Sequence, residues 1–211
     1  MKTLLIIDVQ NDFMPGGSLP VPDGDKIVPI INSMQHKFDL VVAALDWHPQ
    51  DHVSFASNHE GKSSFDEIEI QGESQTLWPH HCVQGTEGAK FHRDLNTNKW
   101  EAVFRKGTDK EIDSYSAFYD NGHLKSTGLT GYLKDKGVSQ LFLCGLAADI
   151  CVYFSAYDAF KEGFACFFIE DASQPLDPKK ISRTKKENEL SRNSNHFLRR
   201  YLKSVLKRNY L

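Results

Sequence analysis

The sequence predicts an α/β fold of three layers, α/β/α, with a mostly parallel central sheet. Short apolar runs of strand length recur along the chain, and segments with helical spacing of apolar residues separate them. Because these runs are apolar throughout, both faces of the sheet are expected to lie under helices, as in parallel sheets. The 211 residues, of which 40% are hydrophobic, suffice for one domain with a substantial core.

The predicted elements alternate in a regular order. Buried strands are predicted at residues 4–7, 40–45, 102–104, 141–144 and 164–169, and helices at 27–36, 129–136 and 151–162. Gly137 and Gly163 follow the last two helices, where glycine commonly ends a helix. Residues 50–100 are rich in polar residues, Gly, His and aromatics and show little periodicity. They predict a loop-rich insertion, and such long stretches are usually functional.

Charge is distributed unevenly along the chain. Residues 176–211 contain 11 Lys/Arg and 3 Asp/Glu, a net charge of +8, whereas residues 1–175 contain 14 and 25, a net charge of −11. We expect residues 1–175 to form the main domain and residues 176–211 to form a basic helical segment packed on it. A basic tail can also contact nucleic acid or a membrane surface. We favour a solvated helix face beside the acidic body and expect no nucleic-acid partner.

The N-terminal apolar run ends after four residues, at Asp8, and is too short for the core of a signal peptide. No apolar run approaches the ~20 residues of a membrane span. We therefore expect a cytoplasmic protein without a membrane partner, whose four cysteines are free thiols. Cys144 and Cys166 lie in apolar runs and are expected in the core, whereas Cys82 and Cys151 have polar or turn-like surroundings.

Reactive residue types stand where the predicted strands end. Ligands of open α/β sheets bind at the carboxyl ends of the strands. The sequence places there an acid, a metal-ligand pair, a lysine, a cysteine and two further acids: Asp8, Asp46 and His48, Lys106, Cys151, and Glu170 and Asp171. Each residue alone has a structural explanation, as a turn residue, a helix cap, a surface lysine or a core cysteine. Their convergence on one edge of the sheet predicts an active site.

Cys151 is the predicted nucleophile. It opens a helix, where free N–H groups and the helix dipole favour a thiolate. A thiol with a pKa of ~8.5 is largely protonated at neutral pH and needs a base. Asp8 can accept its proton, and Lys106 can stabilise the thiolate. The backbone N–H groups of the turn at residues 146–150 can point at a developing oxyanion.

A metal site is the second prediction for this edge. In an extended segment, Asp46 and His48 point to the same side, and His81 is a third candidate in the loop. Such a set leaves positions open for water or substrate, as catalytic metal sites do. With nine histidines in the chain, a chance pair is the alternative. Phe13 and Trp78 are candidate pocket walls, with plain core positions as the alternative.

Six segments together resemble the nicotinamidases of the isochorismatase-like cysteine hydrolase superfamily. In order along residues 3–173, they are DVQNDF (8–13), DWHPxDH (46–52), WPHHCVQGTEGAKFH (78–92), FRKG (104–107), DSYSAF (113–118) and CGLAADICV (144–152). The resemblance implies a catalytic triad of Asp8, Lys106 and Cys151. It also implies a cis peptide between Leu146 and Ala147, which would aim the N–H groups of Ala147 and Cys151 into an oxyanion hole.

The resemblance further implies one divalent metal ion, expected to be zinc with iron or manganese as alternatives. Its ligands would be Asp46, His48 and His81. The implied substrate-binding residues are Phe13, Trp78, Leu146 and Ala147, and Asp113 would contact a metal-bound water. The implied reaction is hydrolysis of nicotinamide to nicotinate and ammonia through a cysteine thioester, in NAD salvage, with pyrazinamide as a further substrate.

Two alternatives remain open at this point. One is a sibling amidase that acts on a ureido or carbamoyl compound, and the other is a non-catalytic protein that uses the basic tail for binding. Residues 176–211 depart from the family pattern, which continues with a helix and a final strand. Whether the chain forms a homo-oligomer is also left open.

Overall fold

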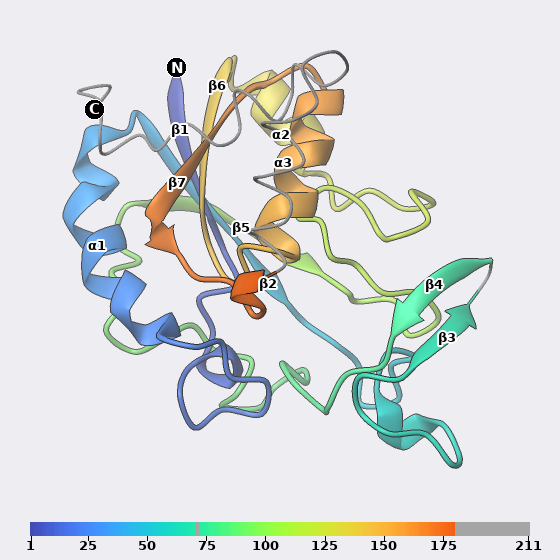
Figure 1. The fold of residues 1–211 in the computed structure, drawn as a ribbon. Helices are drawn as coiled ribbons and strands as arrows, with labels where there is room; N and C mark the ends of the chain where they lie inside the picture. Colours follow the sequence, from blue (N-terminus) through green and yellow to red (C-terminus); the bar gives the residue numbers. More distant parts are fainter. Residues whose placement is uncertain (71, 180–211) are drawn as a thin grey trace.

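The computed structural model describes residues 1–70 and 72–179, and a five-stranded parallel sheet forms its centre (Figure 1). The order of the strands is β5-β2-β1-β6-β7, and every neighbouring pair is parallel. The strands are β1 (Lys2–Ile7), β2 (Leu40–Asp46), β5 (Trp100–Lys106), β6 (Gln140–Gly145) and β7 (Ala165–Ser173). The predicted α/β fold with a mostly parallel sheet is confirmed, and all five predicted strands are present.

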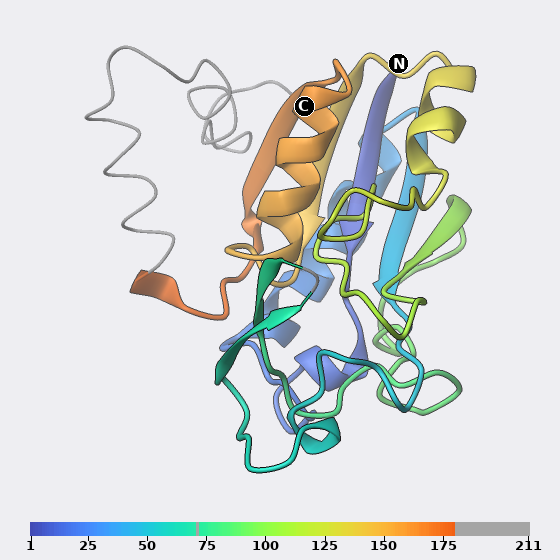
Figure 2. The same cartoon turned by 90° about the vertical axis from the view of Figure 1, so that its right-hand side faces the viewer.

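Three helices cover the sheet. Helix α1 (Ile27–Met34) lies on one face, and α2 (Leu129–Asp135) and α3 (Cys151–Lys161) lie on the other (Figures 1 and 2). Each helix turns an apolar side to the sheet, as Ile27, Ile31 and Met34 of α1 do. The described part of the chain therefore has the predicted three layers.

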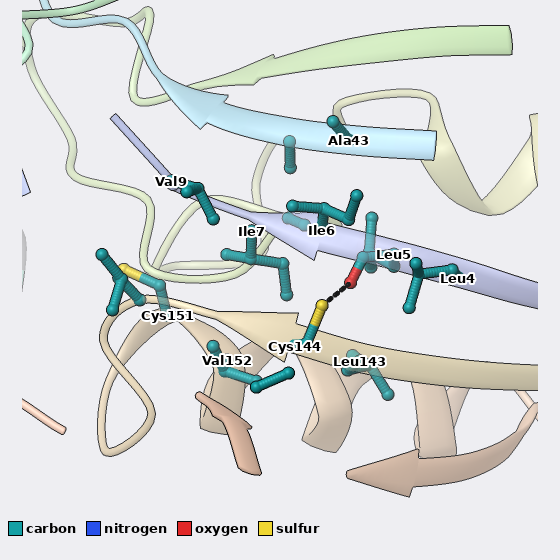
Figure 3. Close-up of a cluster of buried hydrophobic side chains, with 14 of the residues drawn as sticks. Leu4, Leu5, Ile6, Ile7, Val9, Ala43, Leu143, Cys144, Cys151 and Val152 are labelled. Carbon is teal, nitrogen blue, oxygen red and sulfur yellow. Dashed lines mark hydrogen bonds between the residues drawn. The ribbon is translucent and has the colours of Figure 1, made fainter. Parts of the chain in front are cut away.

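The core explains why the three central strands, β2, β1 and β6, are largely apolar. Successive side chains of a strand point to opposite faces, and here both faces lie under helices. Figure 3 shows the result around β1, where Leu4, Leu5, Ile6 and Ile7 are all buried. Cys144 of β6 belongs to this cluster, with its sulfur 3.9 Å from the carbonyl oxygen of Leu5. Its expected place in the core is confirmed. The edge strand β5 was predicted to be buried, but it exposes Glu101, Val103 and Arg105.

The stretch predicted as a loop-rich insertion contains an antiparallel hairpin of β3 (Glu67–Ile70) and β4 (Glu73–Thr76). The hairpin lies beyond the carboxyl ends of the sheet strands (Figures 1 and 2). The insertion is rich in loops as predicted, but this hairpin was not predicted. Strand β3, Glu-Ile-Glu-Ile, does alternate polar and apolar residues, whereas β4, Glu-Ser-Gln-Thr, has no apolar residue and gives no such signal.

Strand β7 extends further than predicted, to Ser173. Its pairing with β6 shifts register between Leu143 and Gly145, and Gly145 pairs with Ser173. Glu170 and Asp171 therefore lie within the strand and are exposed. Their predicted position past the end of a strand was wrong, because an edge strand tolerates exposed charges.

The basic segment predicted at 176–211 lies outside the described residues from position 180 onward. Its first residues are described and are tied to the turn before α3. The N–H groups of Leu176 and Asp177 donate to the two carboxylate oxygens of Asp149, at 2.7 and 3.0 Å. Among the described helices, none combines the length and the apolar character needed to cross a membrane.

Candidate functional site

The carboxyl ends of four strands bring the predicted reactive residues together. Asp8 follows β1, Asp46 ends β2, Lys106 ends β5, and Cys151 begins α3 after β6. The parallel register matches the ends of these strands, since Ile7 pairs with Ala44 and with Gly145, and Asp46 pairs with Lys106. All four reactive side chains are buried. Figure 3 shows Cys151 near Ile7 and Val9, toward the end of β1.

Gly145 allows the turn that leads to Cys151. Its φ is +126°, and a Cβ atom at this position would lie 1.9 Å from the carbonyl oxygen of Ile7. Only glycine fits so close to β1 in this conformation. The next N–H, that of Leu146, donates to Ile7 O at 2.9 Å. The peptide between Leu146 and Ala147 is cis, as the resemblance implied.

Lys106 lies at the centre of the cluster. Its Nζ donates to Asp46 Oδ1 at 2.6 Å, to the carbonyl oxygen of Ser114 at 3.1 Å and to the sulfur of Cys151 at 3.5 Å. These contacts use its three N–H groups. Asp8 Oδ2 lies 2.9 Å from Nζ, but neither carboxylate oxygen of Asp8 accepts an aligned hydrogen bond from the described residues. Lys106 therefore holds Asp8 through its charge.

The charges around Cys151 keep its thiol protonated. Burial raises the pKa of Cys151 well above its usual value, and the carboxylates of Asp8 and Asp46 raise it further against the opposing effect of Lys106. Burial also raises the pKa of Asp8 to about 7, although Lys106 acts against this rise. Burial and two carboxylates outweigh the lysine, so the thiol needs a base, as the sequence led us to expect.

Asp46 and Lys106 stay charged despite their burial. Burial opposes the ionisation of Asp46, but Lys106 and the neighbouring imidazoles outweigh it and lower the pKa of Asp46. Burial would likewise lower the pKa of Lys106, but Asp46, Asp8 and Cys151 raise it well above its usual value. The cluster thus contains a fixed ion pair beside a thiol and a carboxyl that titrates near neutrality.

Asp46 also faces two histidines. Asp46 Oδ1 lies 3.4 Å from His48 Nε2, and Asp46 Oδ2 lies 3.9 Å from His81 Nε2. One ligand atom from each of the three residues lies within 4.8 Å of the others. The Nδ1 atoms of His48 and His81 donate to the carbonyl oxygens of Gly107 and Pro79, both at 2.9 Å. Because a carbonyl only accepts, each ring presents an unprotonated Nε2 to Asp46 when it is neutral.

These three donors fit a divalent metal ion. One carboxylate and two imidazoles form the kind of set that leaves positions open for other ligands. Burial and the neighbouring His48 lower the pKa of His81 to about 4, so its ring is neutral and available to bind. Gly107 makes room for His48, since a Cβ atom there would lie 2.3 Å from the imidazole. His52, which the sequence analysis did not single out, is buried with its ring 4.3 Å from that of His48.

A cavity opens beside Cys151 and two of the three donors, with about 380 Å³ of empty space that is partly open to solvent. Seven residues predicted for the site line it, namely Phe13, Asp46, Trp78, His81, Asp113, Ala147 and Cys151. Leu146, expected to bind substrate, is fully buried and is not part of the lining. Five lining residues were not predicted, namely Leu19, Val21, Tyr115, Ile150 and Leu176.

Two backbone N–H groups of the turn remain candidates for binding an oxyanion. The N–H groups of Leu146, Ala148, Ile150 and Val152 already donate to backbone carbonyl oxygens. Among the described residues, neither the N–H of Ala147 nor that of Cys151 donates such a bond, although the carbonyl oxygen of Ala147 accepts two, and both residues line the cavity. Cys82, the other cysteine with polar surroundings, is fully buried, and burial raises the pKa of its thiol well above its usual value.

The fold and the site define an α/β enzyme in which a buried cysteine, an aspartate and a lysine lie beside a set of metal-type donors. The sequence profile described as "Isochorismatase domain" matches residues 2–190. The chain belongs to the isochorismatase family.

Relatives in this family are similar over most of the chain. A nicotinamidase of Acinetobacter baylyi is 47% identical over 174 residues, which are 82% of this chain and 81% of the relative. A nicotinamidase of Escherichia coli is 43% identical over 180 residues, 83% of this chain and 84% of the relative.

Solved structures share the fold. A nicotinamidase-pyrazinamidase of Acinetobacter baumanii has a TM-score of 0.86 and 46% identity, covering 90% of this chain and 92% of its own. The yeast nicotinamidase bound to the inhibitor nicotinaldehyde has a TM-score of 0.83 and 31% identity, covering 90% of this chain and 96% of its own. The pyrazinamidase of Pyrococcus horikoshii in complex with zinc has a TM-score of 0.72 and 36% identity, covering 90% of this chain and 94% of its own.

Proposed function

We propose that the protein is a nicotinamidase, which hydrolyses nicotinamide to nicotinate and ammonia, and that pyrazinamide is a second substrate. The observation that carries the proposal is the cavity, which brings the thiol of Cys151 next to aromatic walls and metal-type donors. The nicotinamidases of Acinetobacter and Escherichia coli support it, since both are more than 40% identical to this chain.

The first half of the reaction forms a thioester. Asp8 takes the proton of Cys151, and the sulfur attacks the amide carbonyl carbon, which forms a C–S bond and an oxyanion. Asp8 then returns the proton to the amide nitrogen, the C–N bond breaks, and ammonia leaves. The pKa of about 7 suits Asp8 to both transfers, because the group can gain and lose a proton near neutral pH.

The second half hydrolyses the thioester. Asp8, again a carboxylate, takes a proton from a water molecule, and the resulting hydroxide attacks the thioester carbon. The C–S bond breaks, the sulfur regains a proton, and the carboxylic acid is released. Lys106 keeps Asp8 and Cys151 in place and stabilises the sulfur as it gains negative charge, through contacts of 2.9 and 3.5 Å.

The N–H groups of Ala147 and Cys151 are the proposed oxyanion hole. The N–H of Cys151 lies at the start of α3, where N–H groups carry partial positive charge, and that of Ala147 belongs to the turn before the helix. Donors held in place before the reaction stabilise the charge that develops in the transition state, and removal of one such donor typically costs ~10²–10³ in rate.

Asp46, His48 and His81 are the proposed ligands of one divalent metal ion, and zinc fits this donor set best. The zinc complex of the Pyrococcus horikoshii relative supports this choice. When bound, the ion supplies Lewis acidity for a ring nitrogen of the substrate. Phe13 and Trp78 would enclose the flat ring, since both are buried aromatic residues that line the cavity.

An ammonia-release assay tests the proposal. The purified protein is incubated with nicotinamide, with pyrazinamide and with an N-carbamoyl compound, before and after chelation of metal. We expect release from the two ring amides, loss of that release on chelation, and recovery with zinc. Release from the carbamoyl compound alone would instead identify the sibling amidase that the sequence analysis left open.

A further inference from the structure

The hairpin β3–β4 contacts residues that line the cavity. Gln75 of β4 is buried, although it belongs to a hairpin whose Glu67, Glu69 and Glu73 are exposed. Its amide nitrogen lies 3.0 Å from Asp113 Oδ2, 3.2 Å from the hydroxyl oxygen of Tyr115 and 2.7 Å from the carbonyl oxygen of Thr76. Two of these three acceptors belong to residues that line the cavity.

Asp113 depends on Gln75 for its orientation. One of its carboxylate oxygens accepts the N–H of Ser114 at 2.7 Å, which is a contact within its own loop. The other oxygen accepts the amide of Gln75. The carboxylate lies against the metal-type donors, because ligand atoms of Asp113, His48 and His52 lie within 4.8 Å of one another. If a buried carboxylate loses one of its two donors, one oxygen is left unsatisfied. The side chain would then rotate toward another donor.

Tyr115 connects the same contact to the aromatic wall. Its ring lies edge-on to that of Trp78, with 6.2 Å between centroids. The amide of Gln75 therefore contacts both the polar side of the cavity, at Asp113, and the aromatic side, at Tyr115. Because Gln75 belongs to a separate hairpin, its side chain fixes the position of the loop that carries Asp113 and Tyr115 by contacts from another segment.

We propose that Gln75 is a positioning residue for substrate binding, which holds Asp113 and Tyr115 in the arrangement that shapes the cavity. This inference rests on the proposed function. Gln75 touches neither Asp8, Lys106 nor Cys151 in the described structure, so it governs binding and not the chemical steps. Its loss should therefore raise KM and leave kcat nearly unchanged. The nearby metal-type donors should also bind zinc less tightly.

The test compares Gln75→Met with Ser74→Ala. Methionine keeps the length of the side chain and removes the donor. Ser74 is the preceding residue of β4, is exposed, and its hydroxyl donates to Glu67 at 2.9 Å. Ser74→Ala therefore weakens the hairpin and keeps the contacts of Gln75 with Asp113 and Tyr115. We expect Gln75→Met to raise KM about tenfold, a typical effect for a residue that orients the groups of a site, and Ser74→Ala to change it less than twofold.

Two further measurements separate positioning from general stability. Affinity for zinc, measured by competition with a chelator, should fall in Gln75→Met and not in Ser74→Ala. In the background of Asp113→Asn, Gln75→Met should raise KM by less than it does in the wild type, because the two residues act through one contact. Gln75→Glu keeps the shape of the side chain and opposes Asp113 with a like charge. It serves if Gln75→Met does not fold, and it should raise KM at least as much.

The outcomes distinguish this inference from the proposed function. Equal KM values for the Gln75→Met and Ser74→Ala variants, with wild-type turnover of nicotinamide intact, would overturn the inference alone. A fall in kcat at constant KM would also overturn it. Wild-type protein that releases no ammonia from nicotinamide would overturn the proposed function, while the zinc competition would still decide whether Gln75 supports the metal-type donors.

Discussion

The side-chain amide of Gln10 is hydrogen-bonded to both backbone groups of Asp46. Its Nε2 donates to Asp46 O at 2.8 Å, and Asp46 N donates to its Oε1 at 2.9 Å. A further bond, from Nε2 to the carbonyl oxygen of Ala89 at 2.9 Å, completes the set for this fully buried residue. Because Asp46 faces Lys106 on one side and two histidines on the other, Gln10 fixes the backbone of the residue that both clusters share.

Replacing Gln10 by Met should impair both stability and activity. The change leaves three buried backbone groups without their partner, at a cost of about 2–3 kcal/mol, and kcat/KM should fall at least tenfold. The matched control is Gln35→Met, since Gln35 is also buried and bonded, to Asn96 O and to Trp100 Nε1, but precedes β2 at the opposite end of the sheet. Thermal melts should shift for both variants, and kcat/KM per folded molecule should fall for Gln10→Met alone.

Cys151→Ala should abolish ammonia release, by at least about 10⁴-fold, because no other group can form the thioester. Nicotinate should still bind, since the walls of the cavity are unchanged. Cys144→Ala provides the control: its thiol is also buried, in the core between β6 and β1. That variant should lose about 1 kcal/mol of stability and keep its turnover. Turnover retained by Cys151→Ala would contradict the mechanism.

His48→Ala should lose the metal ion and raise KM strongly. Elemental analysis of the purified protein measures the first effect, with the exposed His36→Ala as a control. Gly107→Ala should act in the same direction, because its new Cβ atom would displace the imidazole of His48 and because alanine disfavours the positive φ of +62°. Metal content equal to that of the wild type in His48→Ala would show that the ligand assignment is wrong.

The pH profile of kcat/KM should report the ionisation of Asp8. With a pKa of about 7, its carboxylate fraction falls about tenfold per unit below pH 6, and kcat/KM should fall with it and level off above pH 8. The same raised pKa means that protonation of Asp8 stabilises the fold as the pH falls through 7. Melting temperatures recorded along the profile should therefore show no loss of stability from this group. A profile that stays flat down to pH 5 would exclude Asp8 as the base.

Much of the site could be predicted because it lies where strands end. The runs before Asp8 and Asp46 are apolar and have the length of strands, a shorter apolar run at 102–104 precedes Lys106, and parallel pairing brings such ends to one edge whatever the details of packing. The glycine that ends β6 and the helix that begins at Cys151 were likewise visible as local signals. Residue type and position were sufficient for these features.

Other features depend on contacts between distant segments. A glutamine carries no local signal, so Gln10 and Gln75 could not be distinguished from surface residues until the fold brought them to Asp46 and Asp113. The direction in which the pKa of Cys151 shifts also depends on contacts between distant segments. A helix start favours a thiolate, but burial beside two carboxylates, which only the assembled sheet produces, decides the balance.

The hydrogen bonds that the N–H groups of Leu176 and Asp177 donate to Asp149 have a consequence for shortened versions of the chain. Leu176 lines the cavity, one residue beyond the boundary suggested by charge. A chain cut after residue 175 would keep Asp8, Lys106 and Cys151 but would lose this side wall. Such a truncated protein should accept bulkier ring amides and bind nicotinamide less tightly. Residues that lie beyond the sheet in the sequence therefore contribute to the substrate selectivity of the enzyme.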